Sequence, residues 1–260
     1  MSAGTDHPHI EAGRGSTPLP ASAVPRRRPR RTTALVLGAL TVLVLAGCTT
    51  PTDAAPVPSA SAQMPRAVTS AEADLLASVG FRLGQRQVVA IAGTIVDQTG
   101  GVAINGWLSP QTHQAYAAIT TPSGASFLSL WTASEVTAQD VAEPAPPLPI
   151  PAAGWESTAL DASASSLAAG QKLLASIATD RPDNAQLVAQ GGAQFLREDT
   201  VGSTPVTVFA GVRSEGATQS NLRYWITTDG TLIRLEMRLD GVTWSTVDFA
   251  DETRDIFAGL

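Results

Sequence analysis

The chain has 260 residues, 43% of them hydrophobic, and its single cysteine, Cys48, excludes a disulfide within the chain. Beyond Cys48 there are 11 arginines and lysines against 21 aspartates and glutamates, a net charge of −10. Such an acidic surface is expected to repel nucleic acid and anionic lipid headgroups, so any membrane attachment must rest on something other than a basic patch.

The first 47 residues are not expected to belong to the mature, folded protein. Residues 1–25 are polar and rich in glycine, serine and proline, and are interpreted as a disordered cytoplasmic extension or as the product of a start codon placed too far upstream. Residues 26–47 have the three parts of a secretory signal peptide. These are the arginines of PRRRPRR, an uncharged apolar run over residues 34–47, and the small residues Ala46 and Gly47 at its end.

Cys48 follows directly, so that the stretch LAGC resembles the lipobox of bacterial lipoproteins. The resemblance implies that a diacylglycerol is attached to the Cys48 sulfur and that the signal is cut before this residue. The alternative is an uncleaved signal anchor, although the apolar run is shorter than the roughly 20 residues that span a bilayer. The arginine run leaves open whether export is by the general secretory or the twin-arginine route.

Residues 48–66 are dominated by proline, alanine, serine and threonine, and cannot bury enough apolar surface to fold. We expect an acylated cysteine followed by a flexible tether, which holds the domain of residues 67–260 away from the bilayer. The expected location is the cell membrane, with the protein lipid-anchored on its extracytoplasmic face.

The domain is predicted to begin with a helix in TSAEADLLASVGF, because Thr69 and Glu72 have the spacing of a capping box. Four apolar, β-branched segments follow and predict an antiparallel meander: QVVAIAGTIVD, GGVAINGWLS, QAYAAITTP and SFLSLWTAS. Residues 142–154 are proline-rich and predict a stiff loop that divides the domain into two halves.

A second helix is predicted over SSLAAGQKLLASIAT, where Leu167, Leu174 and Ile177 form an apolar stripe. After it, the segments NAQLVAQGGAQFLRED and TPVTVFAGV predict a return to strands.

The clearest pattern lies in NLRYWITTDGTLIRLEMRLDGVTWSTVDF. Its two Asp-Gly pairs, at residues 229–230 and 240–241, predict hairpin turns and therefore three adjacent antiparallel strands. Strict alternation predicts that one face of these strands is buried. The residues expected on that face are Leu222, Tyr224, Ile226, Ile233, Leu235, Met237 and Leu239. Trp225 faces the other way, and packing under other side chains is favoured over a binding role.

Signatures of catalysis are missing from the sequence, which has no Cys/His cluster, no G-x-S-x-G motif and no glycine-rich phosphate loop. His113 is the only histidine after the signal peptide, and it is interpreted as a surface residue in a turn. One interpretation of the carboxylates in DFADETRD, residues 248–255, is a calcium site. Their spacing does not match an EF-hand, so a solvated helix turn is the preferred interpretation. We therefore expect no enzyme activity, no catalytic residues, no metal and no cofactor.

Taken in chain order, the lipobox, tether, helix, strands, proline-rich crossing, second helix and closing meander are similar to lipoproteins of the LolA-like, LppX/LprG class. The resemblance covers residues 69–255 and is best in YWITTDGTLIRLEM. It implies an α+β fold in which a strongly curved antiparallel half-barrel sheet covers a few helices. It also implies an apolar concave face that holds acyl chains, in proteins that carry lipids or lipoproteins between membranes.

Two functions remain open at this point. The first is a membrane-anchored envelope lipoprotein that binds a lipid or amphiphile in a cavity lined by Ile226, Ile233, Leu235, Met237 and Leu239. The second is a tethered interaction or scaffold lipoprotein with a solid core, no cargo and an unknown protein partner. The first-half strands are rich in alanine and glycine, and such small residues either widen a pocket or let helix and sheet pack closely. No sequence feature supports a third option, a hydrolase that uses carboxylates.

The lipobox interpretation leads to the first prediction. Cys48→Ser is expected to abolish acylation and membrane association, because the thiol that carries the diacylglycerol is lost. The measurement is partition of the wild-type and variant proteins with membranes after alkaline washing. A variant that stays with the membranes would indicate an uncleaved anchor instead.

Overall fold

The structure is a computed structural model that describes residues 64–97, 100–141 and 143–258. The predicted extension, the signal peptide, Cys48 and nearly all of the predicted tether lie outside these residues. Within the described part of the chain, no helix has both the length and the apolar character that a membrane span requires. The unit Pro56–Leu260 has its own hydrophobic core, so the polypeptide beyond the signal segment is expected to fold by itself.

The described residues contribute twelve strands to a single antiparallel sheet made of two meanders. The N-terminal meander contains β2 (Val89–Asp97), β3 (Gly100–Ser109), β4 (Gln114–Thr120), β5 (Ser126–Trp131), β6 (Glu135–Val141) and β7 (Glu156–Ala159). The C-terminal meander contains β8 (Gln194–Val201), β9 (Thr204–Ala210), β10 (Leu222–Ile226), β11 (Leu232–Met237) and β12 (Ser245–Asp251). A two-residue strand, β1 (Arg66–Ala67), pairs with β8.

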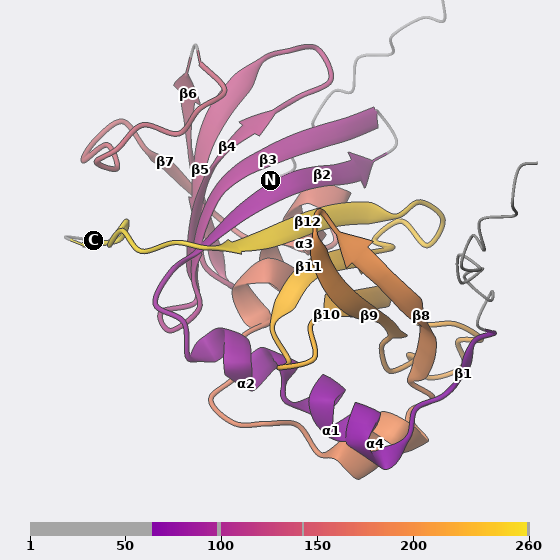
Figure 1. Cartoon of the computed structure of the whole chain (residues 1–260). Helices are drawn as coiled ribbons and strands as arrows, with labels where there is room; N and C mark the ends of the chain where they lie inside the picture. The colour runs from indigo at the N-terminus through magenta and orange to yellow at the C-terminus, as the bar shows by residue number, and fades with distance from the viewer. Residues whose placement is uncertain (1–63, 98–99, 142, 259–260) are drawn as a thin grey trace, which may run out of the picture. The chain divides into compact units, whose positions relative to one another are not determined.

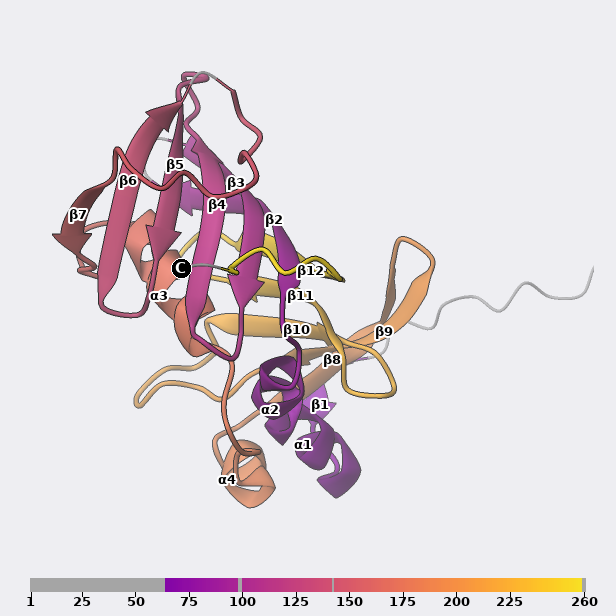
Figure 2. The ribbon, with the colours of Figure 1, turned by 90° about the vertical axis from the view of Figure 1, so that its left-hand side faces the viewer.

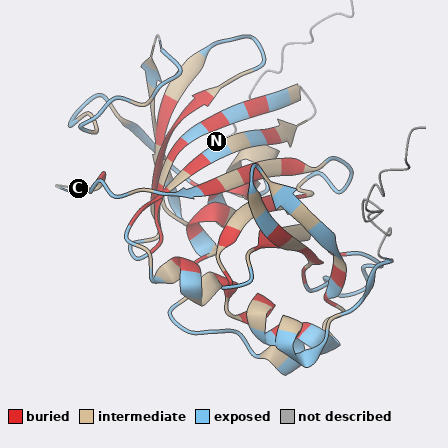
Figure 3. Ribbon diagram, viewed as in Figure 1, coloured by how far each residue is buried: buried red, intermediate tan, exposed pale blue. Residues whose placement is uncertain are grey.

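The order of the strands is β1-β8-β9-β10-β11-β12-β2-β3-β4-β5-β6-β7, so the two meanders join where β12 pairs with β2. The sheet curves strongly and stays open, with β1 and β7 at its edges (Figure 1). Buried and exposed residues alternate along β3, as expected for strands with one face toward a core (Figure 3). The predicted α+β half-barrel is therefore confirmed.

Four helices are described: α1 (Ser70–Ala77), α2 (Val79–Gly84), α3 (Ser166–Ser176) and α4 (Ala185–Gln190). The predicted capping box at the start of α1 is confirmed, because the Thr69 hydroxyl accepts a hydrogen bond from the Glu72 amide and the Glu72 carboxylate accepts one from the Thr69 amide. The Arg66 guanidinium donates to the same carboxylate at 2.7 Å and is the main reason why the pKa of Glu72 falls to about 2. One carboxylate thus ties the edge strand β1 to the first helix.

Helix α3 fills the concave side of the N-terminal meander, and in Figure 2 it lies behind β5 and β6. A Cβ atom at Gly170 would lie 2.7 Å from the Ile95 Cδ1 atom, so helix and sheet are in close contact here and a larger residue would require the Ile95 side chain to move. The Trp131 indole donates to the Gln171 carbonyl and the Gln171 amide donates to the Ser129 hydroxyl, both at 2.9 Å. The small residues of the first-half strands could either widen a pocket or let helix and sheet pack closely, and close packing is what the structure shows between α3 and this meander.

The C-terminal meander buries most of the face predicted from alternation. Ile226, Leu235 and Met237 have 0% exposure in the main core, and Leu239 packs partly buried against it. The position of Ile233 was predicted wrongly. Ile226 pairs with Leu232, but the preceding residue Trp225 pairs with Arg234, so Ile233 is the extra residue of a β-bulge. Its side chain packs on the opposite face, in a small cluster around Trp225.

Two other expectations are corrected by the structure, and two strands were missed. The segment that begins at residue 184, which was predicted to be a strand, starts with helix α4. Asn184 caps this helix by accepting hydrogen bonds from the Gln186 and Leu187 amides, and the strand β8 begins only at Gln194. The acidic segment near the C-terminus is not a helix turn, since β12 runs to Asp251. Strands β6 and β7 were not predicted, because their residues are mostly half-buried or exposed and lack clear alternation.

The proline-rich loop covers the outer face of the sheet instead of separating two halves of the domain. It connects β6 to β7, which pair with each other. The Tyr116 hydroxyl donates to the Pro147 carbonyl at 2.9 Å, and the Trp155 indole donates to the Pro151 carbonyl at 2.7 Å. Together with Ile256, these contacts bury a second hydrophobic cluster on the outer side of β4 and β5.

Burial of Met237 leads to the second prediction. Met237→Arg is expected to unfold the domain, because an unpaired buried charge costs more than the marginal stability of a domain can offset. Met237→Ala is expected to lower the free energy of unfolding by about 2–5 kcal/mol. Both are measured by urea denaturation of residues 49–260. The control is Val242→Arg, at a side chain that is 79% exposed; a folded Met237→Arg protein would show that this face is not a packed core.

Candidate functional site

A pocket of about 240 Å³, lined by both apolar and polar groups, lies where the C-terminal meander meets the helices. Helices α1 and α2 contribute one wall, the chain from the end of α3 to α4 contributes a second, and β10 contributes a third. The apolar lining residues are Leu76, Val79, Ile177, Val188, Leu222 and Tyr224. We call this space the helix–β10 pocket.

Backbone contacts hold the second wall of the helix–β10 pocket in place. The Thr179 amide donates to the Gly80 carbonyl at 3.1 Å, and the Asp183 amide donates to the Ala77 carbonyl at 2.9 Å. A Cβ atom at Gly80 would lie 2.8 Å from the Ile177 carbonyl oxygen, so glycine is needed for this approach. The segment after α3 is thereby strapped to α1 and α2, and the space left between this segment and β10 is the pocket.

The polar groups of the pocket do not form a catalytic arrangement. The Thr179 hydroxyl donates to the Arg181 carbonyl at 2.9 Å and is not paired with a base. Burial raises the pKa of Tyr224 to about 12, and the charge of Asp183 adds to this shift. Tyr224 is therefore a neutral phenol at physiological pH. What the described residues offer is a space lined by apolar side chains together with the hydroxyls of Thr179 and Tyr224 and the carboxylate of Asp183, which suits binding of an apolar group that carries a polar end.

The five residues predicted to line a cavity do not line the helix–β10 pocket. Three of them are core residues, Ile233 is on the other face, and Leu239 packs near Gly170 of α3. The pocket is instead lined by Leu222 and Tyr224, which lie on β10 and belong to the same alternating pattern of apolar residues. The helical walls carry no local signal of a pocket, because they are brought to β10 only by the fold.

Three of the four acidic residues in the segment 248–255 pair with arginines. Asp248 pairs with Arg234 and Asp251 with Arg86. Glu252 accepts hydrogen bonds from Arg254 at 2.6 Å and from the Trp107 indole at 3.0 Å, and mainly because of Arg254 its pKa falls to about 2. In the described ranges no three His, Cys, Asp or Glu side chains gather as a metal site, so the calcium interpretation gains no support.

His113 was interpreted as a surface residue in a turn, but its side chain contacts the end of α3. Its φ angle of 56° places it in the left-handed region, in the turn between β3 and β4. Its Nδ1 atom lies 3.0 Å from the Ala175 carbonyl oxygen at the end of α3. The histidine therefore fastens this turn to the helix.

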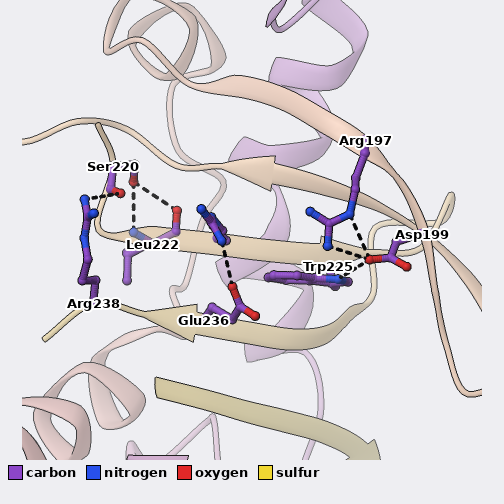
Figure 4. Close-up of polar contacts among 8 residues, drawn as sticks. Arg197, Asp199, Ser220, Leu222, Trp225, Glu236 and Arg238 are labelled. Atoms are coloured by element: carbon purple, nitrogen blue, oxygen red, sulfur yellow. Dashed lines mark hydrogen bonds and ion pairs between the residues drawn. The ribbon is translucent and has the colours of Figure 1, made fainter. Parts of the chain in front are cut away.

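The outer face of β10 is closed by packing, as expected for Trp225. This side chain is 3% exposed, and its indole donates to the Asp199 carboxylate at 3.3 Å, which also accepts from Arg197 at 2.8 Å (Figure 4). Further along the strand, Arg223 donates to Glu236 at 3.3 Å. This aromatic side is thus occupied by the protein's own side chains.

No protein-family model and no curated protein sequence matches the chain. Solved structures similar to it include the lipoprotein LppX of Mycobacterium tuberculosis, with a TM-score of 0.40 and 13% identity over 72% of this chain and 96% of that chain. A conserved protein from Thermus thermophilus has a TM-score of 0.38 and 11% identity over 72% and 90% of the two chains.

A third similar structure is a domain from Vibrio parahaemolyticus described as an outer membrane lipoprotein-sorting protein. Its TM-score is 0.26, with 9% identity over 70% of this chain and 92% of that chain. Proteins of the LppX and lipoprotein-sorting types, which the sequence resemblance names, are thus among the structural neighbours.

Buried phenols lead to the third prediction. Tyr116 and Tyr224 are the chain's two tyrosines, and burial raises the pKa of each to about 12. Ultraviolet titration of the folded protein is expected to show phenolate only toward pH 12, against about 10 in denaturant. Because the folded-state pKa is raised, the associated stability is fully present below pH 10 and is lost as the pH rises toward 12. A phenolate step near pH 10, retained in Tyr116→Phe and lost in Tyr224→Phe, would contradict the burial of Tyr224.

Proposed function

We propose that the chain is a lipid-anchored lipoprotein of a bacterial cell envelope whose half-barrel domain binds the apolar end of a lipid or other amphiphile. The anchor would be a diacylglycerol on Cys48, with the domain held on the extracytoplasmic face by the tether of residues 48–66. The observation that carries the binding proposal is the helix–β10 pocket, a space bounded by sheet and helices and lined in large part by apolar side chains.

The size of this pocket limits what it takes. At about 240 Å³ it is below the roughly 300–1,000 Å³ of drug-sized ligand sites. It therefore suits part of an acyl chain rather than a whole lipid. About five buried methylenes would contribute on the order of 4 kcal/mol before the cost of association. Since association itself costs at least about 4 kcal/mol, the rest of the amphiphile must make further contacts outside this pocket for the complex to be stable.

A second function is favoured by a separate observation. Helix α3 is packed against the N-terminal meander without room between Gly170 and Ile95, so that half of the concave face is solid. A tethered scaffold or interaction module would need nothing more than such a core. The described residues of the helix–β10 pocket show no nucleophile paired with a base, and neither proposal includes catalysis.

Native mass spectrometry distinguishes the two functions and is the fourth prediction. Residues 49–260 are produced in a lipid-containing host and purified without detergent, and an adduct of lipid mass is expected. Val212 lines the pocket but is 47% exposed, so Val212→Trp should occlude the pocket without unfolding the domain and should abolish the adduct. The matched control is Val242→Trp, at a side chain that is 79% exposed and outside the pocket, and it should keep the adduct.

A bare polypeptide mass, with no uptake of added fatty acid or phospholipid, would remove the amphiphile proposal and leave the scaffold. An adduct that persists in Val212→Trp would place the ligand elsewhere in the domain. In both cases circular dichroism of the variants verifies that the fold is kept.

A further inference from the structure

A second pocket, of about 620 Å³, lies between α2 and the turn that joins β10 to β11. The residues whose polar groups line it are Ser78, Arg82, Gln85, Arg86, Thr231 and Asp251. It shares no lining residue with the helix–β10 pocket. We call it the arginine pocket, because two guanidinium groups meet there in a domain whose overall charge is negative.

Arg86 has hydrogen-bonding capacity that the described residues leave unused. One terminal nitrogen, Nη2, pairs with the Asp251 carboxylate. The other, Nη1, is buried from solvent and has no hydrogen-bond partner in the described part of the chain. Buried polar groups are nearly always hydrogen-bonded, and an unpaired N–H of a charged group is especially costly. The missing partner of Nη1 is an acceptor.

Arg82 brings a second positive charge whose position is fixed. Its Nε atom donates to the Ser78 hydroxyl at 3.0 Å. A Cβ atom at Gly230 would lie 2.6 Å from the same Nε atom, so the arginine lies directly on the glycine of the turn. Among the described residues Arg82 makes no ion pair, in contrast to Arg86. Two guanidinium groups against the single carboxylate of Asp251 leave the pocket with a net positive charge.

We propose that the arginine pocket binds an oxyanion of the phosphate type, held by Arg82 and Arg86. The planar fork of a guanidinium matches two oxygens of a phosphate, and charge-assisted hydrogen bonds of this kind are the strong ones. The Gln85 side-chain amide lines the same pocket and can donate to a further oxygen, whereas the Ser78 and Thr231 hydroxyls already donate to the Leu75 carbonyl and the Asp229 carboxylate. The phosphate belongs to a soluble phosphomonoester or to a lipid headgroup. The inference goes beyond the helix–β10 pocket and does not rest on it.

The test is a titration of isotope-labelled residues 49–260 followed by nuclear magnetic resonance at constant ionic strength. The three probes are inorganic phosphate, glycerol 3-phosphate and a short-chain phosphatidic acid below its micelle concentration, with sodium chloride as the reference. Saturable shifts are expected at the Nε–H groups of Arg82 and Arg86 and at the Gln85 side-chain amide. Equal affinity for all three probes identifies a soluble phosphate compound, and binding of the lipid probe alone identifies a headgroup.

Two arginine variants complete the fifth prediction. Arg82→Gln removes an exposed side chain without an ion pair, so the fold is kept, and it should weaken binding by about tenfold or more, the scale of one charge-assisted hydrogen bond. Arg213→Gln removes an exposed arginine outside the pocket and should leave binding unchanged. The proposal is overturned if no probe saturates, if chloride gives the same shifts, or if the two variants bind equally well.

Discussion

The antiparallel pairing of β12 with β2 is the interaction on which this domain depends, because it makes one curved sheet out of two meanders. The pairing runs from Thr246 opposite Thr94 to Asp251 opposite Val89. Near one end of the pairing, where Gly93 lies opposite Val247, the strands come so close that a Cβ atom at Gly93 would lie 2.0 Å from the Thr246 carbonyl oxygen. A side chain there would separate the two halves of the sheet, and with them the common face that the helices cover.

The two halves of that face are used differently. Under the N-terminal meander, α3 is fixed by buried hydrogen bonds to β5 and by the contact of Gly170 with Ile95, and the core is solid. Toward β10 the cover is made of short helices and a strapped segment, and short elements fill a curved surface less completely than one long helix. Both pockets of interest lie against α2. One half of the face is thus a solid core, and both pockets lie at the end with the short helices.

How far the sequence predicts this structure depends on how local each signal is. Thr69 and Glu72 act within one helix turn, and the Asp-Gly pairs act within single hairpins, so the first helix and the closing meander were predicted correctly. The alternation failed at Ile233, because the bulge between Leu232 and Arg234 interrupts the alternation at that residue and leaves no local mark in the sequence. The pockets were not predictable, because Arg82 and Thr231 meet only through the pairing of distant strands.

The two ends of the open sheet carry a further consequence. An unclosed sheet has two edges, and each edge strand offers unpaired backbone groups to a neighbouring molecule. Here β7 has only four residues and β1 only two, and the part of β8 that β1 leaves uncovered carries the sequence Arg197, Glu198, Asp199. Short and charged edges discourage strand-to-strand stacking. Under the proposed anchoring through Cys48, the protein would be confined to a two-dimensional surface and would meet copies of itself far more often than a free protein does, and these edges would keep the copies apart.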